Sequence, residues 1–492
     1  MNYSKLSFSR LKSQSLYSQL VKRLEGAIET GELANEERLP SERDLAEQLR
    51  MSRTTIATAY RELEARGLVR SHVGRGTFVC AAADPIDGPF AWRGKISAGT
   101  AHLSHDPAMR QLMRDVANPD MISFTAGAPA LECFPVDEYR RLMDGVLKRS
   151  AHVALGNAAT EGQPRLRKAI AGYFGAKPEH ILILSGAQQG LDLIARCLLD
   201  PGDAVIIDRP GYVGAIQTFR LAGANLVGWD IVRADLDELE DLILRYRPKL
   251  IYTNPTFQNP TGRVLPLRER QEMLKLAARY RVPIVEDDPY GETYLDTPPP
   301  PSLYRLDKYH IVIYLSTLSK TLAPGIRLGW LVASDYVVEQ LTAIKQRENL
   351  FTEGPGQLVV AEFLERGLFS DHLVLMRKEH SKRLNILNQA IDRHLPRKTL
   401  DFTQPKGGLY LWCRLGRGVE AQRLLQHAIV SGVAFANGEM FYSDDAGRQD
   451  LRLCFSHVPG DRIEEGIRRL SKAFAALKAS PLTHDASAVP LV

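Results

Sequence analysis

One short stretch of the chain combines a primary amine with several groups that bind phosphate. Residues 314–327 read Tyr-Leu-Ser-Thr-Leu-Ser-Lys-Thr-Leu-Ala-Pro-Gly-Ile-Arg, and an apolar run at residues 311–315 predicts a buried strand just before the polar part. The amine of Lys320 can form a Schiff base with an aldehyde, and the groups suited to hold a phosphate beside it belong to Thr317, Ser319 and Arg327. Pyridoxal 5'-phosphate (PLP) carries both an aldehyde and a phosphate, so the stretch is a candidate PLP site. A solvated turn would have a similar composition, so this interpretation depends on the surrounding elements.

The elements that would position Lys320 form an alternating pattern of strands and helices. Strand-like runs are expected at residues 181–184, 204–207, 250–253, 283–285 and 311–315. Helical stretches such as residues 188–199 and 268–279 lie between several of them. The alternation predicts a largely parallel α/β sheet with helices on both faces. In such sheets ligands bind beyond the carboxyl ends of the strands.

The residues that follow these runs are suited to contact such a ligand. A Gly-rich turn at residues 185–190 opens a helix, whose N-terminus can bind a phosphate. Further along, Tyr212 can stack on a ring, and a turn-rich loop contains the amide of Asn259. The carboxylate of Asp287 can keep a pyridine nitrogen protonated. Each feature alone has a structural explanation, but four of them together with the lysine favour one common site.

The first eighty residues predict a separate module. Apolar residues recur at helical spacing from Leu16, and Ser41 and Ser52 are expected to cap two further helices. A turn at residues 74–76 then separates two short strand-like runs. Helix, helix-turn-helix and hairpin together form a winged helix-turn-helix, although a small helical bundle with a charged face is the simpler alternative.

Charge and position favour double-stranded DNA as the partner of this module. Residues 50–75 carry a net charge of +4 from six arginines and two glutamates. A recognition helix contacts base edges with its N-terminal residues, which here are Ser52, Arg53, Thr54 and Thr55. The expected contacts to the phosphate backbone come from Arg43 and Arg75, and Gly74 of the wing is also expected to be a DNA-binding residue.

Composition limits the remaining alternatives. The chain has 492 residues, 44% of them hydrophobic, and a formal net charge of +5, which predicts a packed globular protein. Its five cysteines are scattered, so reduced thiols are expected rather than a disulfide framework or a zinc site. No apolar run approaches 18 residues, so a membrane span is not expected, and the N-terminus has no apolar h-region, so a signal peptide is not expected either. A cytoplasmic protein is predicted.

The N-terminal module resembles the GntR family of bacterial regulators. The resemblance rests on five blocks in the family's order, namely Leu-Pro-Ser-Glu-Arg at residues 39–43, Ser-Arg-Thr-Thr at 52–55, Tyr-Arg-Glu-Leu-Glu at 60–64, Gly-Leu-Val at 67–69 and Gly-Arg-Gly-Thr-Phe at 74–78. It implies a winged helix-turn-helix DNA-binding domain over residues 13–81. An expected polar linker follows at residues 82–118.

Residues 119–478 resemble the fold-type I PLP-dependent aminotransferases, in particular the kynurenine and 2-aminoadipate group. The resemblance implies Lys320 as the Schiff-base lysine, Asp287 at the pyridine nitrogen, Asn259 and Tyr290 at the phenolic oxygen, Tyr212 against the ring, and Gly186, Ala187, Gln188, Ser319 and Arg327 around the phosphate. Lys320, Asp287 and Tyr212 would be the catalytic residues. Arg452 matches the arginine that binds the substrate α-carboxylate. One departure is that Asn157 stands near the place of a tyrosine that usually reaches the partner subunit's phosphate.

A winged helix fused to an aminotransferase-like domain is similar to the MocR subfamily of GntR regulators. The resemblance implies a mostly parallel seven-stranded sheet, a small C-terminal α+β subdomain and a homodimer, with a loose tail at residues 479–492. It favours a PLP-dependent DNA-binding transcriptional regulator that senses an amino compound. An active aminotransferase that carries a DNA-binding module is the alternative, and a domain that keeps PLP only as a structural core is the third.

Overall fold

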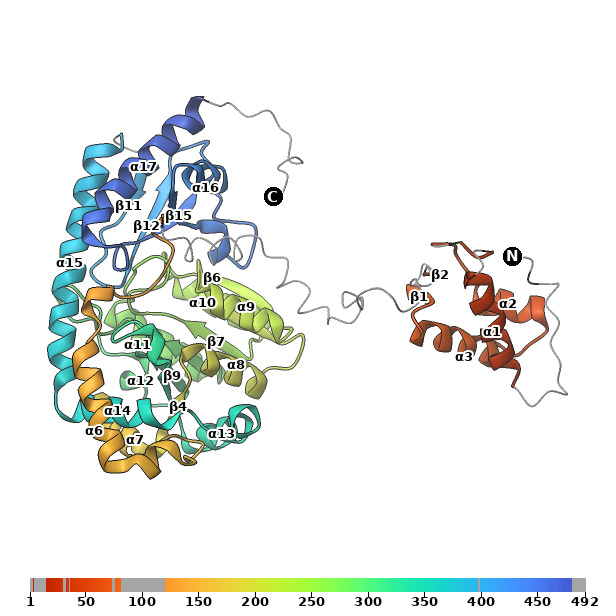
Figure 1. Ribbon diagram of the computed structural model, residues 1–492, viewed down its shortest axis with the longest axis horizontal. Coiled ribbons are helices and arrows are strands. Elements are labelled where there is room, and N and C mark those ends of the chain that lie inside the picture. The colour runs from red at the N-terminus through yellow and green to blue at the C-terminus, as the bar shows by residue number, and fades with distance from the viewer. Residues whose placement is uncertain are drawn as a thin grey trace. The chain divides into compact units, whose positions relative to one another are not determined.

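The computed structural model describes residue 3 and residues 15–29, 32–34, 36–72, 76–80, 120–396 and 399–479. The chain divides into two compact units, residues 1–96 and residues 97–492 (Figure 1). Each unit has its own buried core. The expected linker at residues 82–118 and nearly all of the expected tail lie outside the described residues. The domain boundaries taken from the sequence therefore stay predictions.

The N-terminal unit contains three helices and a hairpin. They are α1 (Leu16–Glu29), α2 (Glu42–Leu49), α3 (Arg53–Ala65), β1 (Val69–His72) and β2 (Gly76–Val79), with the two strands antiparallel. The Ser41 hydroxyl accepts a hydrogen bond from Asp44 N at 3.2 Å, and the Ser52 hydroxyl accepts one from Thr55 N at 3.1 Å. Both serines therefore cap helices as predicted. The winged helix-turn-helix expected from the sequence is confirmed.

The segment at Arg38 and Leu39 pairs with β2 of the wing, and the sequence pattern does not predict this pairing. Arg38 forms an isolated antiparallel bridge with Phe78, and Leu39 N donates to Thr77 O at 2.8 Å. The apolar stripe predicted for the third helix is correct, because the buried residues of α3 are Ile56, Ala59, Tyr60 and Leu63. These side chains hold α3 against α1 and α2 and fix the face that α3 presents to solvent.

The C-terminal unit is organised around a seven-stranded sheet with the order β4-β10-β9-β8-β7-β5-β6. The strands are β4 (Ile181–Leu184), β5 (Ala204–Arg209), β6 (Asn225–Asp230), β7 (Leu250–Thr253), β8 (Ile284–Asp287), β9 (Val312–Thr317) and β10 (Gly329–Val332). The five neighbouring strands β9, β8, β7, β5 and β6 pair parallel. Strand β10 pairs antiparallel with β4 and β9. The mostly parallel seven-stranded sheet is therefore confirmed.

The five strand-like runs of the sequence fall on β4, β5, β7, β8 and β9, but β6 and β10 are not marked. The edge strand β6 has a single buried residue, Trp229, so it lacks a continuous apolar run. The strand β10 begins at Gly329 and has only four residues, all buried, which is too short for a distinct pattern.

Helices cover both faces of this sheet. They are α6 (Val136–Leu155), α7 (Pro164–Phe174), α8 (Ala187–Leu198), α9 (Val213–Leu221), α10 (Leu236–Tyr246), α11 (Leu267–Tyr280), α12 (Leu303–Leu306), α13 (Asp335–Asn349) and α14 (Gly354–Glu365). Strand β4 shows the division, since Ile181 and Ile183 pack with α6, α7 and α14, while Leu182 and Leu184 pack with α8, α9 and α13. The two predicted helices correspond to α8 and α11.

The small C-terminal α+β subdomain is also present as expected. Its antiparallel sheet has the order β11-β12-β15-β14, and a parallel pair, β3 and β13, lies outside that sheet. The elements are β3 (Ile122–Ser123), α15 (Leu368–His394), β11 (Leu400–Phe402), β12 (Tyr410–Leu415), α16 (Ala421–Val430), β13 (Val433–Ala434), β14 (Ala436–Asn437), β15 (Asp450–Cys454) and α17 (Gly460–Ala479). Short 3-10 turns occur at Leu131–Cys133, Pro178–His180, Pro324–Ile326 and Gly438–Phe441.

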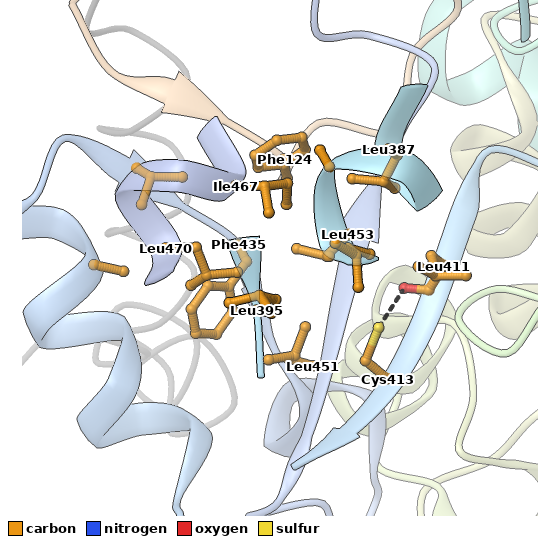
Figure 2. Close-up of a cluster of buried hydrophobic side chains, with 14 of the residues drawn as sticks. Phe124, Leu387, Leu395, Leu411, Cys413, Phe435, Leu451, Leu453, Ile467 and Leu470 are labelled. Atoms are coloured by element: carbon orange, nitrogen blue, oxygen red, sulfur yellow. Dashed lines mark hydrogen bonds between the residues drawn. The ribbon is translucent and has the colours of Figure 1, made fainter. Parts of the chain in front are cut away.

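The core of this subdomain joins residues from both ends of the C-terminal unit. Figure 2 shows Phe124, next to β3, together with Leu387 of α15, Leu453 of β15 and Leu470 of α17. Phe124, Leu453 and Leu470 are fully buried. Among the described helices, none combines the length and the apolar character that a membrane crossing requires.

Replacing Leu470 by alanine should destabilise the C-terminal unit by about 2–5 kcal/mol, because the truncation leaves a cavity in a fully buried core. The matched control is Leu244→Ala on α10, since Leu244 is 55% exposed and its truncation should change the free energy of unfolding by less than about 0.5 kcal/mol. Urea unfolding followed by circular dichroism measures both. Equal effects of the two variants would contradict the assigned core.

Candidate functional site

A cavity of about 250 Å³ lies where β7, β8 and β9 end. Its wall contains most of the residues that the sequence nominates for a cofactor or substrate, namely Ala187, Tyr212, Asn259, Asp287, Tyr290, Thr317, Lys320 and Arg452. Asp287 is the last residue of β8 and Thr317 the last of β9, so the direction of the parallel strands brings these side chains together.

Lys320 lies three residues beyond β9, and its Nζ donates a hydrogen bond to Gly127 O. Burial lowers the pKa of Lys320 to about 8, and the positive charge of Arg452 acts in the same direction. At pH 7 roughly a tenth of such an amine is neutral, compared with well under a thousandth for an ordinary lysine. The neutral amine is the nucleophile, so the site favours attack by Lys320 on a carbonyl carbon.

Asp287 is held by residues of the neighbouring strand. Tyr252 Oη donates to Asp287 Oδ2 at 2.6 Å, and Asn254 Nδ2 donates to the Asp287 carbonyl oxygen. The other carboxylate oxygen, Oδ1, is buried and has no hydrogen-bond partner among the described residues. Burial raises the pKa of Asp287 to about 7. A buried carboxylate with an unpaired oxygen fits a protonated ring nitrogen, which would supply the missing donor and positive charge.

A chain of polar contacts leads from Tyr290 to Arg452. The hydroxyl oxygens of Tyr290 and Tyr410 lie 3.0 Å apart, and Asn259 Nδ2 lies 3.4 Å from Tyr290 Oη. On its other side, Asn259 Oδ1 accepts a hydrogen bond from Arg452 Nη1 at 2.7 Å. Arg452 Nη2 donates to the Thr125 carbonyl oxygen at 2.7 Å. The arginine of the small subdomain is therefore already directed to the cavity.

Arg452 has aromatic rings and neutral oxygens around it rather than a carboxylate. Its guanidinium carbon lies 4.0 Å from the centre of the Tyr410 ring and 4.9 Å from that of Phe441. Its Nε is buried without a hydrogen-bond partner among the described residues. A buried guanidinium without an acidic partner fits an anionic ligand such as a carboxylate.

The groups nominated for a phosphate surround the start of α8. Gly186 precedes α8 with φ of +98°, and no side chain caps this helix. A methyl group added to Gly186 would lie 2.9 Å from Arg327 Nη2, so the glycine allows the close approach of Arg327. Thr317 Oγ1 donates to Ser319 Oγ at 3.0 Å. A helix N-terminus, a guanidinium and two hydroxyls fit a phosphate.

Tyr212 directly precedes α9, without a side-chain hydrogen bond to the helix start, and lines the cavity. Its hydroxyl donates to Gln188 Oε1 at 3.3 Å, and Gln188 Nε2 donates to Thr218 Oγ1 at 2.7 Å. Burial raises the pKa of Tyr212, so its phenol stays protonated at neutral pH. Asn157 is exposed in the loop after α6 and is not among the cavity-lining residues.

Several residues of the site were missed by sequence reasoning. Tyr252 reads as an apolar strand residue, and only the register of β7 and β8 reveals that its hydroxyl reaches Asp287. Tyr410 is the first residue of β12, and the sequence analysis gives it no role. Gly127 contacts the Lys320 amine through its carbonyl oxygen, and a methyl group there would lie 1.9 Å from Tyr410 Oη. The Gly-Ala-Pro sequence at residues 127–129 is the one signal in the sequence for this close approach.

The nominated DNA-binding residues lie at the start of α3 and beside it. The Arg53 side chain is 74% exposed and forms an ion pair with Glu42 at 3.3 Å. Thr54 and Arg43 are also exposed, whereas the hydroxyls of Ser52 and Thr55 lie 2.8 Å apart within the helix cap. Gly74 and Arg75 of the wing lie outside the described residues.

Comparison with known proteins agrees with both units. The model of the aminotransferase class I and II family matches residues 119–470, and the model of the gntR family of bacterial regulatory proteins matches residues 16–79. A 2-aminoadipate transaminase of Thermus thermophilus is 36% identical over 80% of this chain and 99% of its own length. A probable rhizopine catabolism regulatory protein, MocR, of Rhizobium meliloti is 32% identical over 94% of this chain and 95% of its own length.

Among solved structures, the α-aminoadipate aminotransferase LysN of Thermus thermophilus is similar with a TM-score of 0.75 and 35% identity. The match covers 79% of this chain and all of LysN, whose structure holds N-(5'-phosphopyridoxyl)-L-leucine. The match to MocR covers 94% of this chain and therefore includes both units. The matches to the two aminotransferases cover 80% and 79% of the chain, which is about the length of the C-terminal unit. The chain therefore belongs to the aminotransferase class I and II family and, through its GntR-type winged helix, to the MocR-type GntR regulators, in which a DNA-binding domain is fused to an aminotransferase-like domain.

Proposed function

We propose that this regulator holds PLP at Lys320 and senses an amino compound by exchanging that attachment for the ligand's own amine. The observation that carries the proposal is the buried Lys320 amine in a cavity whose wall also contains Asp287 and Arg452. When bound, PLP supplies a carbonyl carbon that primary amines attack and a ring that withdraws electrons. The rest of the reaction depends on residues of this chain.

The proposed roles follow the contacts of each side chain. Asp287 Oδ1 would accept a hydrogen bond from the protonated ring nitrogen, and Tyr252 keeps the carboxylate in place through Oδ2. Asn259 and Tyr290 would donate to the phenolic oxygen, and Tyr212 would cover one face of the ring. The phosphate would lie among Gly186, Ala187, Gln188, Thr317, Ser319 and Arg327.

Arg452 links ligand binding to the position of the small subdomain. Arg452 lies on β15 of the small subdomain. It donates to Asn259 Oδ1, in the loop between β7 and α11, and to the Thr125 carbonyl oxygen, close to β3. A ligand carboxylate that binds Arg452 would compete with these two neutral oxygens for the guanidinium. The ligand therefore binds more tightly to an arrangement in which Arg452 is free to pair with it, and a difference of this kind is what shifts a conformational equilibrium.

Release of Lys320 provides a second change that depends on the ligand. The released Lys320 amine can again become protonated, and both its burial and the positive charge of Arg452 disfavour that protonated form. We propose that the two changes together alter the geometry with which DNA-binding units of a cytoplasmic homodimer meet an operator. The effector is then a small amine, with a carboxylate or a similar anion for Arg452.

A second candidate function is transamination. The similarity to 2-aminoadipate transaminase and the presence of Lys320, Asp287 and Arg452 favour it. Lys320 would then move a proton at the ligand's α-carbon after its release, which requires the neutral amine that its lowered pKa supplies. The two functions differ in whether the ligand is converted or only bound.

Borohydride reduction of the PLP-loaded protein should fix the pyridoxyl group on Lys320, because that amine is the one in the cavity. Peptide mapping by mass spectrometry identifies the labelled lysine. The matched comparison is Lys345, which is also buried, has a pKa lowered to about 8, and donates to Thr160 O outside the cavity. Lys320→Ala should abolish the label and Lys345→Met should keep it. A label on Lys345 would reject the assigned site.

Arg53→Ala should weaken operator binding by about 1–3 kcal/mol if Arg53 contacts a base edge, while the visible PLP spectrum stays unchanged. Arg66→Ala is the control of equal charge. Arg66 lies at the opposite end of α3 and pairs with Glu62 and Glu25. Titrations of both variants at one fixed salt concentration separate a specific contact from general attraction to DNA. An equal loss in both variants would mean that Arg53 is not a recognition residue.

Lys320→Ala should still fold and bind operator DNA, but its DNA affinity should no longer respond to the amino compound that acts on the wild type. Coupling free energies of this kind are about 1–3 kcal/mol, or roughly 5–150-fold in affinity, which fluorescence anisotropy resolves. A transamination assay with the same compound and a keto-acid acceptor runs in parallel. Turnover at about 1–1000 per second with DNA binding that ignores the compound would reject sensing in favour of the enzyme.

A further inference from the structure

A second cavity, of about 280 Å³, lies on the other side of the strand ends that carry Lys320. Its wall contains six aromatic residues, namely Tyr173, Phe174, Tyr294, Tyr314, Trp330 and Phe369, and it contains Asp288. Thr317 and Pro289 line both cavities, so the two share part of one wall. None of these six aromatic side chains lines the Lys320 cavity.

Asp288 is a buried carboxylate without an ion-pair partner among the described residues. Its Oδ2 accepts a hydrogen bond from Tyr314 Oη at 3.2 Å, and its buried Oδ1 has no hydrogen-bond partner among the described residues. Arg270, whose charge also acts on Asp288, lies 3.8 Å from Glu286 and donates to the backbone oxygens of Leu265, Pro301 and Pro255. Two buried carboxylates thus share one buried guanidinium, and Asp288 carries the unbalanced charge.

The charge of Asp288 is nonetheless largely retained. Burial raises its pKa to about 6, while the charge of Arg270 and contacts from Tyr314 and the Gly291 backbone oppose the rise. At pH 7 most of the carboxyl is therefore ionised. An ionised carboxylate at a cavity wall, without an ion-pair partner among the described residues, fits a positively charged ligand.

The other groups at the cavity wall also favour a cation over an anion. Pro289 and the run Pro298–Pro301 line the wall and have carbonyl oxygens but no N–H to donate, and the Pro301 oxygen already accepts a hydrogen bond from Arg270. Tyr173 Oη donates to Glu292, and Ser316 Oγ donates to the Asp288 carbonyl oxygen, so two hydroxyls are already engaged as donors. Aromatic faces and carbonyl oxygens bind organic ammonium groups, above all those that cannot donate hydrogen bonds.

Two wall residues provide a place for an oxygen atom on the same ligand. Trp330 Nε1 is buried and has no hydrogen-bond partner among the described residues. Arg305 also lines the wall, and its guanidinium carbon lies 5.1 Å from the centre of the Phe174 ring while Nη2 donates to Phe174 O at 2.8 Å. A hydroxyl or carboxylate oxygen can accept from these donors. The small volume limits the ligand to a few heavy atoms.

We propose that the cavity beside Asp288 binds a small organic ammonium compound that also carries an oxygen acceptor, separately from any amine bound at Lys320. The ammonium group lies against Asp288 and the aromatic faces. This site does not depend on PLP chemistry, because its contacts involve no reaction with a carbonyl. A quaternary ammonium is the discriminating probe, since it has no amine hydrogen and cannot displace Lys320.

Isothermal titration of the full-length protein compares choline with 3,3-dimethylbutan-1-ol, in which carbon replaces the charged nitrogen at nearly unchanged shape. The protein is first loaded with PLP and reduced with borohydride, so that the Lys320 cavity is closed to exchange. Choline should bind at least about tenfold more tightly than the alcohol, because a desolvated cation among aromatic rings and a carboxylate contributes strongly. Equal affinity for the two compounds would overturn the proposal.

Asp288→Asn should reduce choline affinity to that of the alcohol, because it removes the charge and keeps the shape. The matched control is Asp296→Asn, which removes an exposed carboxylate of the following loop outside the cavity and should leave choline binding unchanged. Tyr173→Leu keeps Asp288 and should lower the affinity for choline about threefold, because it removes one aromatic face. If Asp288→Asn does not fold, the choline affinity of Tyr173→Leu tests the proposal instead. Choline binding at wild-type affinity by a folded Asp288→Asn protein, or by Tyr173→Leu, would reject the site.

Discussion

The parallel pairing of β7, β8 and β9 is the constraint on which the candidate cofactor site depends. Because these strands run in one direction, Asn254, Asp287 and Thr317 arrive at the same edge of the sheet. The pairing also sets which neighbour each side chain meets, as the 2.6 Å contact between Tyr252 and Asp287 shows. A shift of one residue in β8 would direct Asp287 to the opposite face. The register of β8 therefore determines the position of the Asp287 carboxylate more than the loop after β8 does.

Charge in the Lys320 cavity is distributed between two ends. Asp287 provides a buried carboxylate with one unpaired oxygen, and Arg452 provides a buried guanidinium that neutral oxygens and two rings hold. Lys320 lies between these influences, since Arg452 lowers its pKa while Asp287 raises it. The cavity thus has a place for a positive group at one end and for a negative group at the other. This polarity matches a ring cation together with a ligand carboxylate, and it needs no conformational change to appear.

Much of the fold follows from local patterns in the sequence, and the site follows in part. Caps at Ser41 and Ser52, the apolar stripe of α3 and five of the seven central strands are predicted because each depends on neighbouring residues. The strand β6, with its single buried residue, and the four-residue β10 carry too little pattern to be found. The contact of Tyr252 with Asp287 and that of Gly127 with Lys320 join residues 35 and 193 positions apart. Such contacts depend on register and tertiary packing, which periodicity does not encode.

Asp287 is the last residue of β8 and Asp288 follows it directly, yet the two line different cavities. Alternation along a strand explains this, because adjacent side chains point to opposite faces. Ser316 and Thr317 at the end of β9 extend the same arrangement, since Ser316 Oγ donates to the Asp288 carbonyl oxygen and Thr317 lines both cavities. A ligand in either cavity therefore contacts the segment that leads directly to Lys320. If binding on one side favours one position of that segment, the other side must feel the same free-energy difference, because such coupling is reciprocal. The strand ends are thus the physical element through which two chemically different ligands would act on one lysine.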